Sequence, residues 1–140
     1  MKILEDLGKI ALVTLSYMNH KIKIKNAIIS VFNKDGLNEI IKTLADFNIE
    51  LYSTGGTENF IKSLNVNVNK IEDLTSYPSI LGGRVKTLHP NVFGGILSRR
   101  ANNEDKEQLE NYNIPEFDLV IVDLYPFEET VKNNLSHSEI

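Results

Sequence analysis

The sequence has no cysteine in its 140 residues, which excludes both a disulfide framework and a thiolate-ligated zinc site. Its three histidines, His20, His89 and His137, lack the spacing of metal ligands, so we expect no protein-bound metal. Long apolar runs are also missing: residues 10–13 are far too few to span a membrane, and they do not resemble a signal peptide. The formal net charge of -4 argues against a general nucleic-acid-binding protein.

The rest of the composition is that of an ordinary globular domain. Hydrophobic residues make up 41% and charged residues 24% of the chain, and no repeat or low-complexity tract interrupts it. A chain of this length is expected to form one domain. We expect residues 1–24 to be an amino-terminal extension, with Met18 as a natural start, and residues 25–140 to be the domain itself. The absence of cysteine fits a cytoplasmic location without requiring one.

Predicted strands and helices alternate from residue 26 onward, which is typical of a parallel sheet covered on both faces. The strands are expected at residues 27–32, 49–53, 66–71, 95–97 and 118–124, with the third near a sheet edge. Asp35 is expected to cap a first helix, a second follows Thr57, and residues 103–112 form a polar surface helix. The predicted fold class is therefore α/β, with a mainly parallel sheet. The first helix is expected to bury one stripe: Leu37, Ile40, Ile41, Leu44 and Phe47.

Two glycine-rich segments favour an anionic ligand. Residues 82–95 place Arg84, Lys86 and the hydroxyl of Thr87 between two pairs of glycines, and both cations can bind phosphate. Residues 54–57, Thr-Gly-Gly-Thr, join a strand to a helix start, where backbone N–H groups favour a phosphate. Residues 54–57 do not match a named nucleotide-binding loop, because both the Gly-x-Gly-x-x-Gly and the Walker patterns are absent. Alternatives stay open for both, namely an ordinary connecting loop and a plain strand-to-helix turn.

A third segment carries polar groups at the end of a buried strand. The predicted strand at residues 118–124 carries Asp123 near its end, and Tyr125 and Pro126 follow it directly. Ligands of open α/β sheets bind beyond the carboxyl ends of strands. The alternative is that Tyr125 and Phe127 only cover the edge of the sheet.

Together these segments resemble one family. Residues 54–57, 83–90 (Gly-Arg-Val-Lys-Thr-Leu-His-Pro), 94–97 and 124–127 (Leu-Tyr-Pro-Phe) occur in the order and spacing of the amino-terminal IMP cyclohydrolase domain of the bifunctional transformylase/cyclohydrolase of purine biosynthesis. The resemblance covers about residues 25–131. It implies a methylglyoxal-synthase-like fold, a three-layer α/β sandwich. It also implies closure of the purine ring of formylaminoimidazole carboxamide ribotide to give IMP, with loss of water and without a cofactor.

The resemblance also implies the site residues. Lys86 and Tyr125 match catalytic positions, as donors to the oxyanion that forms on the formyl group. Two positions depart from the family: Asn33 stands where an aspartate is common, and Asp123 where asparagine is frequent. His89, before Pro90, is a weaker candidate that could merely shape the loop. The implied substrate-binding residues are Asn33, Lys34, Thr54, Gly55, Gly56, Thr57, Arg84, Val85, Thr87 and Asp123.

The expected partner is a ribotide monophosphate, with no nucleic acid and no membrane, and with a homodimer in the full-length family. The family places a further aspartate and a catalytic lysine beyond the last matched position. We therefore expect a carboxy-terminally incomplete cyclohydrolase domain with little activity by itself. One alternative is a phosphate-binding regulatory module. Another is a methylglyoxal-synthase-type lyase, for which Asp35 and Asp73 are weak candidates as the catalytic aspartate.

Overall fold

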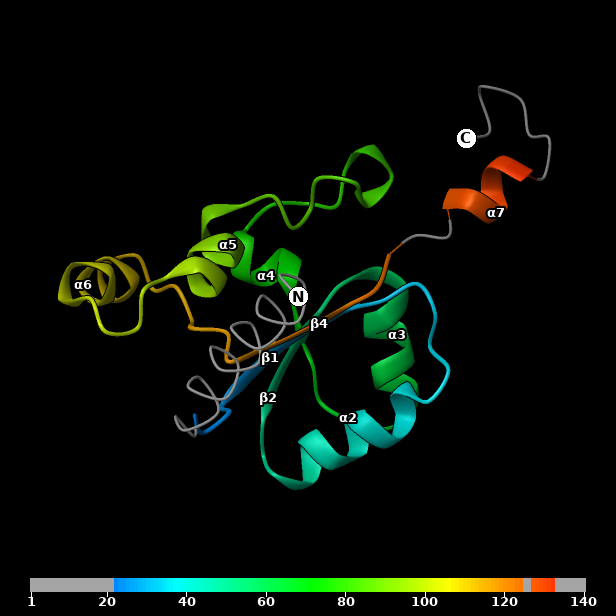
Figure 1. Ribbon diagram of the computed structural model, residues 1–140, viewed down its shortest axis with the longest axis horizontal. Coiled ribbons are helices and arrows are strands. Elements are labelled where there is room, and N and C mark those ends of the chain that lie inside the picture. Colours follow the sequence, from blue (N-terminus) through cyan, green and yellow to red (C-terminus); the bar gives the residue numbers. More distant parts are fainter. Residues whose placement is uncertain (1–21, 125–126, 133–140) are drawn as a thin grey trace, which may run out of the picture.

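The computed structural model describes residues 22–124 and 127–132, and within them a parallel four-stranded sheet carries helices on both faces (Figure 1). The strand order is β3-β2-β1-β4, so β1 lies in the middle and β4 at one edge. The predicted α/β class is confirmed. The elements are β1 Asn26–Ser30, α2 Leu37–Asp46, β2 Glu50–Ser53, α3 Gly55–Ser63, β3 Asn69–Lys70, α4 Ile71–Thr75, the 3₁₀ turn η1 Leu81–Gly83, α5 Pro90–Leu97, α6 Asn103–Asn111, β4 Leu119–Val122 and α7 Phe127–Lys132.

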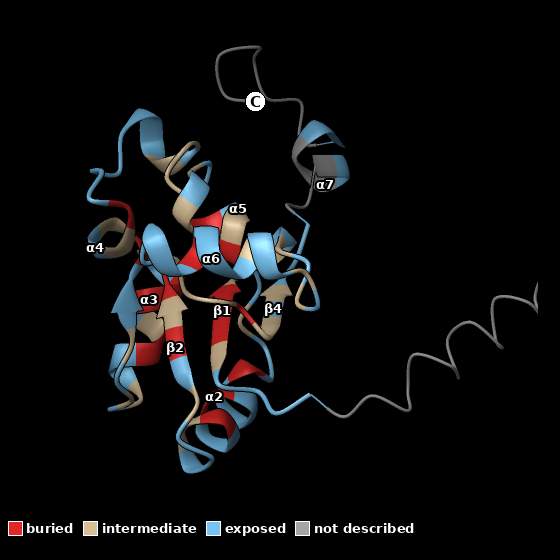
Figure 2. Cartoon of the chain, turned by 90° about the vertical axis from the view of Figure 1, so that its left-hand side faces the viewer, coloured by how far each residue is buried: buried red, intermediate tan, exposed pale blue. Residues whose placement is uncertain are grey.

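Alternate residues of β1 point to opposite faces of the sheet, and each face has its own apolar cluster. Figure 2 shows buried segments in β1 and β2 and in the helices α2 and α5. Ala27 and Ile29 pack with Leu37, Ile41 and Ile61 of α2 and α3. Ile28 lies on the other face, where the buried residues of its cluster are Ile71, Val92 and Phe117. Burial of one such isoleucine contributes about 1.5–3 kcal/mol to stability. The result is the expected three-layer sandwich.

The start of the edge strand β4 is fixed by Asp118. Its carboxylate accepts hydrogen bonds from the backbone N–H groups of Lys25 and Asn26, and it forms an ion pair with Arg100. Burial by itself raises the pKa of Asp118, but these donors outweigh it and hold the pKa below the ordinary value. The carboxylate is therefore charged at neutral pH and ties β4 to the segment that enters β1.

Several local predictions were wrong in detail. Asp35 does not cap α2, which follows Gly36 and has no side-chain cap. Ile40 and Phe47 are 45% and 74% exposed, so the buried stripe of α2 is limited to its other three apolar residues. The third strand is reduced to residues 69–70, because Ile71 begins a helix that the alternating Val-Asn pattern did not reveal. Helix α3 begins at Gly55, two residues before the predicted start.

Residues 95–97 were predicted as a strand but belong to α5. The helix begins at Pro90, which is favoured at a first helical position because it has no N–H to satisfy. His89 precedes it as the N-cap residue, and its Nδ1 accepts a hydrogen bond from the N–H of Asn91 at 3.1 Å. His89 thus shapes the start of α5, which is the alternative that the sequence left open for it.

Gly95 is required by the close approach of α5 to the segment before β4. A Cβ atom at this position would lie 2.0 Å from the carbonyl oxygen of Pro115 and 2.9 Å from the ring of Phe117. We expect Gly95→Ala to destabilise the fold by about 3 kcal/mol, because either α5 or the segment before β4 must move to relieve the clash. Chemical denaturation monitored by circular dichroism measures this change.

Gly94→Ala is the matched control for that experiment. A Cβ atom there meets only side-chain carbons, Ile114 at 3.3 and 3.5 Å and Leu109 at 3.9 Å, and the alanine also gains helix propensity. We expect a change within about 1 kcal/mol for Gly94→Ala. Equal effects of the two substitutions would contradict the assigned packing.

Candidate functional site

The two glycine-rich segments predicted to bind an anion meet in the structure. The ammonium of Lys86 lies against the backbone of Gly55, so closely that a Cβ atom on Gly55 would come within 2.8 Å of Nζ. It also lies beside Gly83, where the corresponding distance is 3.1 Å. The loop between α4 and α5 therefore carries its lysine to the turn that follows β2, at the carboxyl end of the sheet.

The turn after β2 presents the amino-terminal end of α3 to this lysine. Gly55 has a φ angle of 55°, a left-handed conformation that favours glycine. The first N–H groups of an α-helix have no partner within the helix, and together with its dipole they attract an anion. The helix runs over nine residues from Gly55. The turn thus has the backbone geometry of an anion site.

The two threonine hydroxyls of the turn are directed away from that helix end. Thr54 donates its hydroxyl hydrogen to Oε1 of Glu72 at 2.9 Å. The hydroxyl of Thr57 donates to the carbonyl oxygen of Val31 and accepts from its N–H, at 2.9 and 3.1 Å. Both threonines are buried. In this arrangement the turn offers an anion its backbone, while the hydroxyls hold it to β1 and α4.

Lys34 brings a second ammonium to the turn. Its Nζ would lie 4.0 Å from a Cβ atom on Gly56, and it donates a hydrogen bond to the carbonyl oxygen of Phe32 at 3.0 Å. Within the described part of the chain, neither Lys34 nor Lys86 forms an ion pair. Two cations from distant parts of the sequence are therefore available to one anion.

Asp123 anchors the loop that carries Lys34. Its two carboxylate oxygens accept hydrogen bonds from the backbone N–H groups of Phe32 and Asn33, at 2.6 and 2.7 Å. The Phe32 N–H first, and then that of Asn33, hold the pKa of Asp123 below its ordinary value. The side chain of Asn33 in turn accepts from the N–H of Asp35 at 2.9 Å. Ligand binding by Asn33 and Asp123 stays a prediction.

The other predicted residues of the basic loop have different surroundings. Arg84 is exposed, and its Nε donates to the carbonyl oxygen of Leu81 at 3.0 Å. Val85 is half-buried. Thr87 lines a small cavity of about 280 Å³ with Asp123 and apolar residues of β1, β4 and α5. Tyr125, the second predicted catalytic residue, lies outside the described residues, so its convergence with Lys86 stays untested.

Comparison with known proteins identifies the family. A family model described as the MGS-like domain matches residues 36–140, more than half of the chain. The chain belongs to the MGS-like domain family.

Several curated relatives of this MGS-like domain carry the name bifunctional purine biosynthesis protein PurH. The protein of Bacteroides thetaiotaomicron is 57% identical over 123 residues, which are 88% of this chain and 24% of that protein. The protein of Caldicellulosiruptor saccharolyticus is 46% identical over 83% of this chain and 23% of its own length. The chain thus spans about a quarter of the length of these relatives. A solved structure entitled "Crystal structure of ForH" is similar with a TM-score of 0.67 and 29% identity, over 81% of this chain and 62% of that one.

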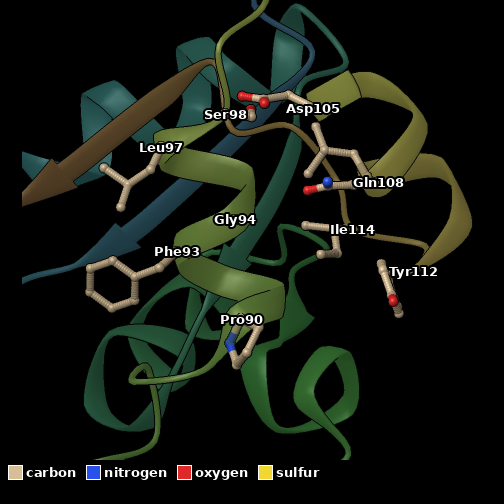
Figure 3. A pocket seen from close by; sticks show the side chains of 10 residues that line it. Pro90, Phe93, Gly94, Leu97, Ser98, Asp105, Gln108, Tyr112 and Ile114 are labelled. Atoms are coloured by element: carbon tan, nitrogen blue, oxygen red, sulfur yellow. The ribbon is translucent and has the colours of Figure 1, made fainter. Parts of the chain in front are cut away.

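A larger pocket of this MGS-like domain does not suit an anion. It has a volume of about 370 Å³ and lies between α5 and α6, where Gly94 faces Ile114 (Figure 3). Its lining is mostly apolar, and its one charged residue, Asp105, is acidic. Among the residues that the structure describes, no group of three histidines or carboxylates could hold a metal, and no helix is long and apolar enough to cross a bilayer.

Glu72, the partner of Thr54 in the turn after β2, is a residue that the sequence did not suggest. It has no motif around it, and it reaches the turn only because β3 and β2 are paired in parallel. A pairing of Thr54 with a carboxylate 18 residues away cannot be read from local spacing. Only the strand order brings the two together.

The geometry predicts which residues determine phosphate affinity. We expect Lys86→Met to weaken binding of inorganic phosphate about tenfold or more, because a charge-assisted hydrogen bond is lost. Lys34→Met should weaken it less, since its ammonium also bonds to a backbone carbonyl. Isothermal titration calorimetry measures both. Lys42→Met, on the exposed side of α2, is the control and should leave the affinity unchanged.

Proposed function

We propose that this chain is the IMP cyclohydrolase part of a bifunctional purine biosynthesis protein. It would close the second ring of formylaminoimidazole carboxamide ribotide to give IMP with loss of water. The observation that carries this proposal is the contact of the Lys86 ammonium with Gly55, because it joins the two motifs that resemble the family. The names of the curated relatives, at up to 57% identity, support the same assignment.

The ribotide phosphate fits the end of α3. A phosphate there would receive backbone N–H groups of the Gly55–Gly56 turn and the charges of Lys34 and Lys86. Both reacting groups, the carboxamide nitrogen and the formyl carbon, belong to the same substrate. Anchoring its phosphate therefore limits the orientations of the ring and lowers the entropic part of the barrier.

The chemical step needs a donor at the formyl oxygen. Attack by the carboxamide nitrogen moves negative charge onto this oxygen, and a positioned cation or phenol stabilises that charge more than it stabilises the substrate. Lys86 and Tyr125 are the proposed donors. The carboxamide nitrogen gives up one proton and the oxyanion gains one, which leaves a hydroxyl group on the former formyl carbon. Water then leaves as this hydroxyl gains a second proton, the formamide nitrogen loses its proton and the C–N double bond forms. No external cofactor is needed for this balance.

Lys86 has two possible tasks at this site. Its ammonium lies at the proposed phosphate position, which favours ground-state binding, whereas the resemblance assigns it a catalytic role. The two tasks differ in whether a change at Lys86 affects substrate affinity or turnover. We propose that Lys86 does both: its positive charge, which an arginine would retain, adds to phosphate affinity, and its hydrogen bond to the forming oxyanion is its principal contribution to turnover.

The wider setting follows from the same assignment. We propose a cytoplasmic protein that acts on a small ribotide monophosphate and does not bind nucleic acid. The full-length protein would be a homodimer that also carries the transformylase activity.

Ligand preference tests the function directly. We expect the 140-residue chain to bind IMP at least about tenfold more tightly than inorganic phosphate, because the nucleoside adds contacts beyond the phosphate. Calorimetric titration with each ligand measures the ratio. Equal affinities would instead favour a phosphate-binding regulatory module. Release of methylglyoxal from dihydroxyacetone phosphate would favour a lyase.

The role of Lys86 is tested where turnover can be measured. A chimera in which this chain replaces the matched segment of the Bacteroides thetaiotaomicron protein provides that setting. We expect Lys86→Arg in the chimera to keep the Michaelis constant within about threefold while kcat for IMP formation falls about a hundredfold, as for loss of one oxyanion donor.

Transformylase activity in the same polypeptide is the internal control, and it should not change. A Lys86→Arg chimera that loses affinity and keeps kcat would show that Lys86 only binds phosphate. A chimera with normal transformylase activity but no ring closure would contradict the proposed function.

A further inference from the structure

Glu72 is a carboxylate beside the anion-binding turn that the proposed reaction does not use. It lies in the first turn of α4, which directly follows β3 at the carboxyl edge of the sheet. Its Oε1 accepts the hydrogen bond from Thr54, whereas its Oε2 is buried and has no hydrogen-bond partner among the described residues. Such a carboxylate oxygen costs free energy, and the dipole of α4 offsets only part of that cost.

Thr54 is the residue that Glu72 controls. It occupies the N-cap position of α3, where a threonine oxygen normally accepts a hydrogen bond from the second or third N–H of the helix. No such bond is present, and the hydroxyl donates to Glu72 instead. A capping threonine and a bound phosphate would compete for the same N–H groups. The orientation of one side chain therefore determines whether the helix end is open.

We propose that Glu72 is a positioning residue that keeps the amino-terminal end of α3 open for the ligand phosphate. It does so by holding the Thr54 hydroxyl away from the first N–H groups of the helix. The inference rests on the proposed function only in requiring that the ligand carry a phosphate. Glu72 acts through Thr54 and does not itself contact the ligand.

The charge of Glu72 and its hydrogen bond with Thr54 have opposite effects on phosphate binding, which makes the proposal testable. The negative charge of Glu72 opposes an anion at the turn, so its removal alone strengthens phosphate binding. Loss of its acceptor oxygen releases Thr54, which weakens phosphate binding. Glu72→Gln removes the charge and keeps an acceptor, whereas Glu72→Leu removes both. The two variants therefore separate the two effects by sign.

The test measures binding of inorganic phosphate to the 140-residue chain by calorimetry. We expect Glu72→Gln to bind at least as tightly as the parent, and Glu72→Leu to bind about three- to tenfold more weakly, the range of an N-cap interaction. In the double variant Thr54→Val/Glu72→Leu no hydroxyl remains to cap the helix. Its affinity should return at least to that of the parent, as expected for Glu72→Gln, because the opposing charge is also absent. Asp73→Asn, which removes an exposed charge from the same helix, is the matched control.

Amide hydrogen exchange provides a second measurement. Without phosphate, the N–H groups of Gly56 and Thr57 should exchange more slowly in Glu72→Leu than in the parent, because Thr54 now caps them. Glu72→Ala replaces the leucine variant if circular dichroism shows that the latter does not fold.

The proposal is overturned if the leucine variant binds phosphate as tightly as the glutamine variant, or if the double variant stays weak. It is also overturned if the parent does not bind phosphate. Preference for IMP and ring closure do not enter this comparison. Failure of the proposed function is therefore distinct from failure of this inference.

Discussion

The parallel arrangement of the strands is the constraint on which the site depends. Because β1 pairs in parallel with both β2 and β4, and β2 with β3, the segments that follow all four strands emerge at one edge of the sheet. Lys34 follows β1, Gly55 follows β2, and Glu72 follows β3. Residues far apart in the sequence therefore meet without any long insertion. A single antiparallel strand would send its following segment to the opposite edge.

Two aspartates hold β4 to the strand beside it. Asp118 precedes β4 and binds the backbone N–H groups that enter β1, whereas Asp123 follows β4 and binds those that leave it. Hydrogen bonds from N–H groups to a charged carboxylate are stronger than those between neutral groups. An edge strand with only one strand neighbour gains most from such bonds. The carboxyl-end pair also positions the loop of Lys34, so strand register and cation placement are coupled.

Hydrophobic pattern explains what the sequence could predict and where it failed. Regular patterns of apolar and polar residues within single segments were enough to predict the strands β1, β2 and β4 and the polar helix α6. The exposure of Phe47 could not be predicted in this way, because α2 ends one residue before it although the apolar spacing continues. Residues 95–97 were predicted as a strand and not as part of a helix. The contact that requires Gly95 is with Pro115, which is distant in the sequence, so local pattern could not reveal it. For the site, the resemblance assigned Lys86 and Gly55 to the same ligand, but no motif predicted the partners of Thr54 and Thr57.

The glycines of the turn have a role that composition alone does not reveal. Gly55 allows a left-handed φ angle and also removes the side chain that would hold the Lys86 ammonium away. The Lys86 ammonium and the first N–H groups of α3 can therefore contact the same anion. At an effective dielectric constant of about 20, a cation about 4 Å from a phosphate charge contributes roughly 4 kcal/mol, and this falls as the separation grows. Because the threonine hydroxyls bond to Val31 and Glu72, the protein satisfies its own polar groups without closing that point to an anion. The proposed preference for a phosphate therefore depends on where the backbone and the lysines are held, more than on the hydroxyls that make the motif recognisable.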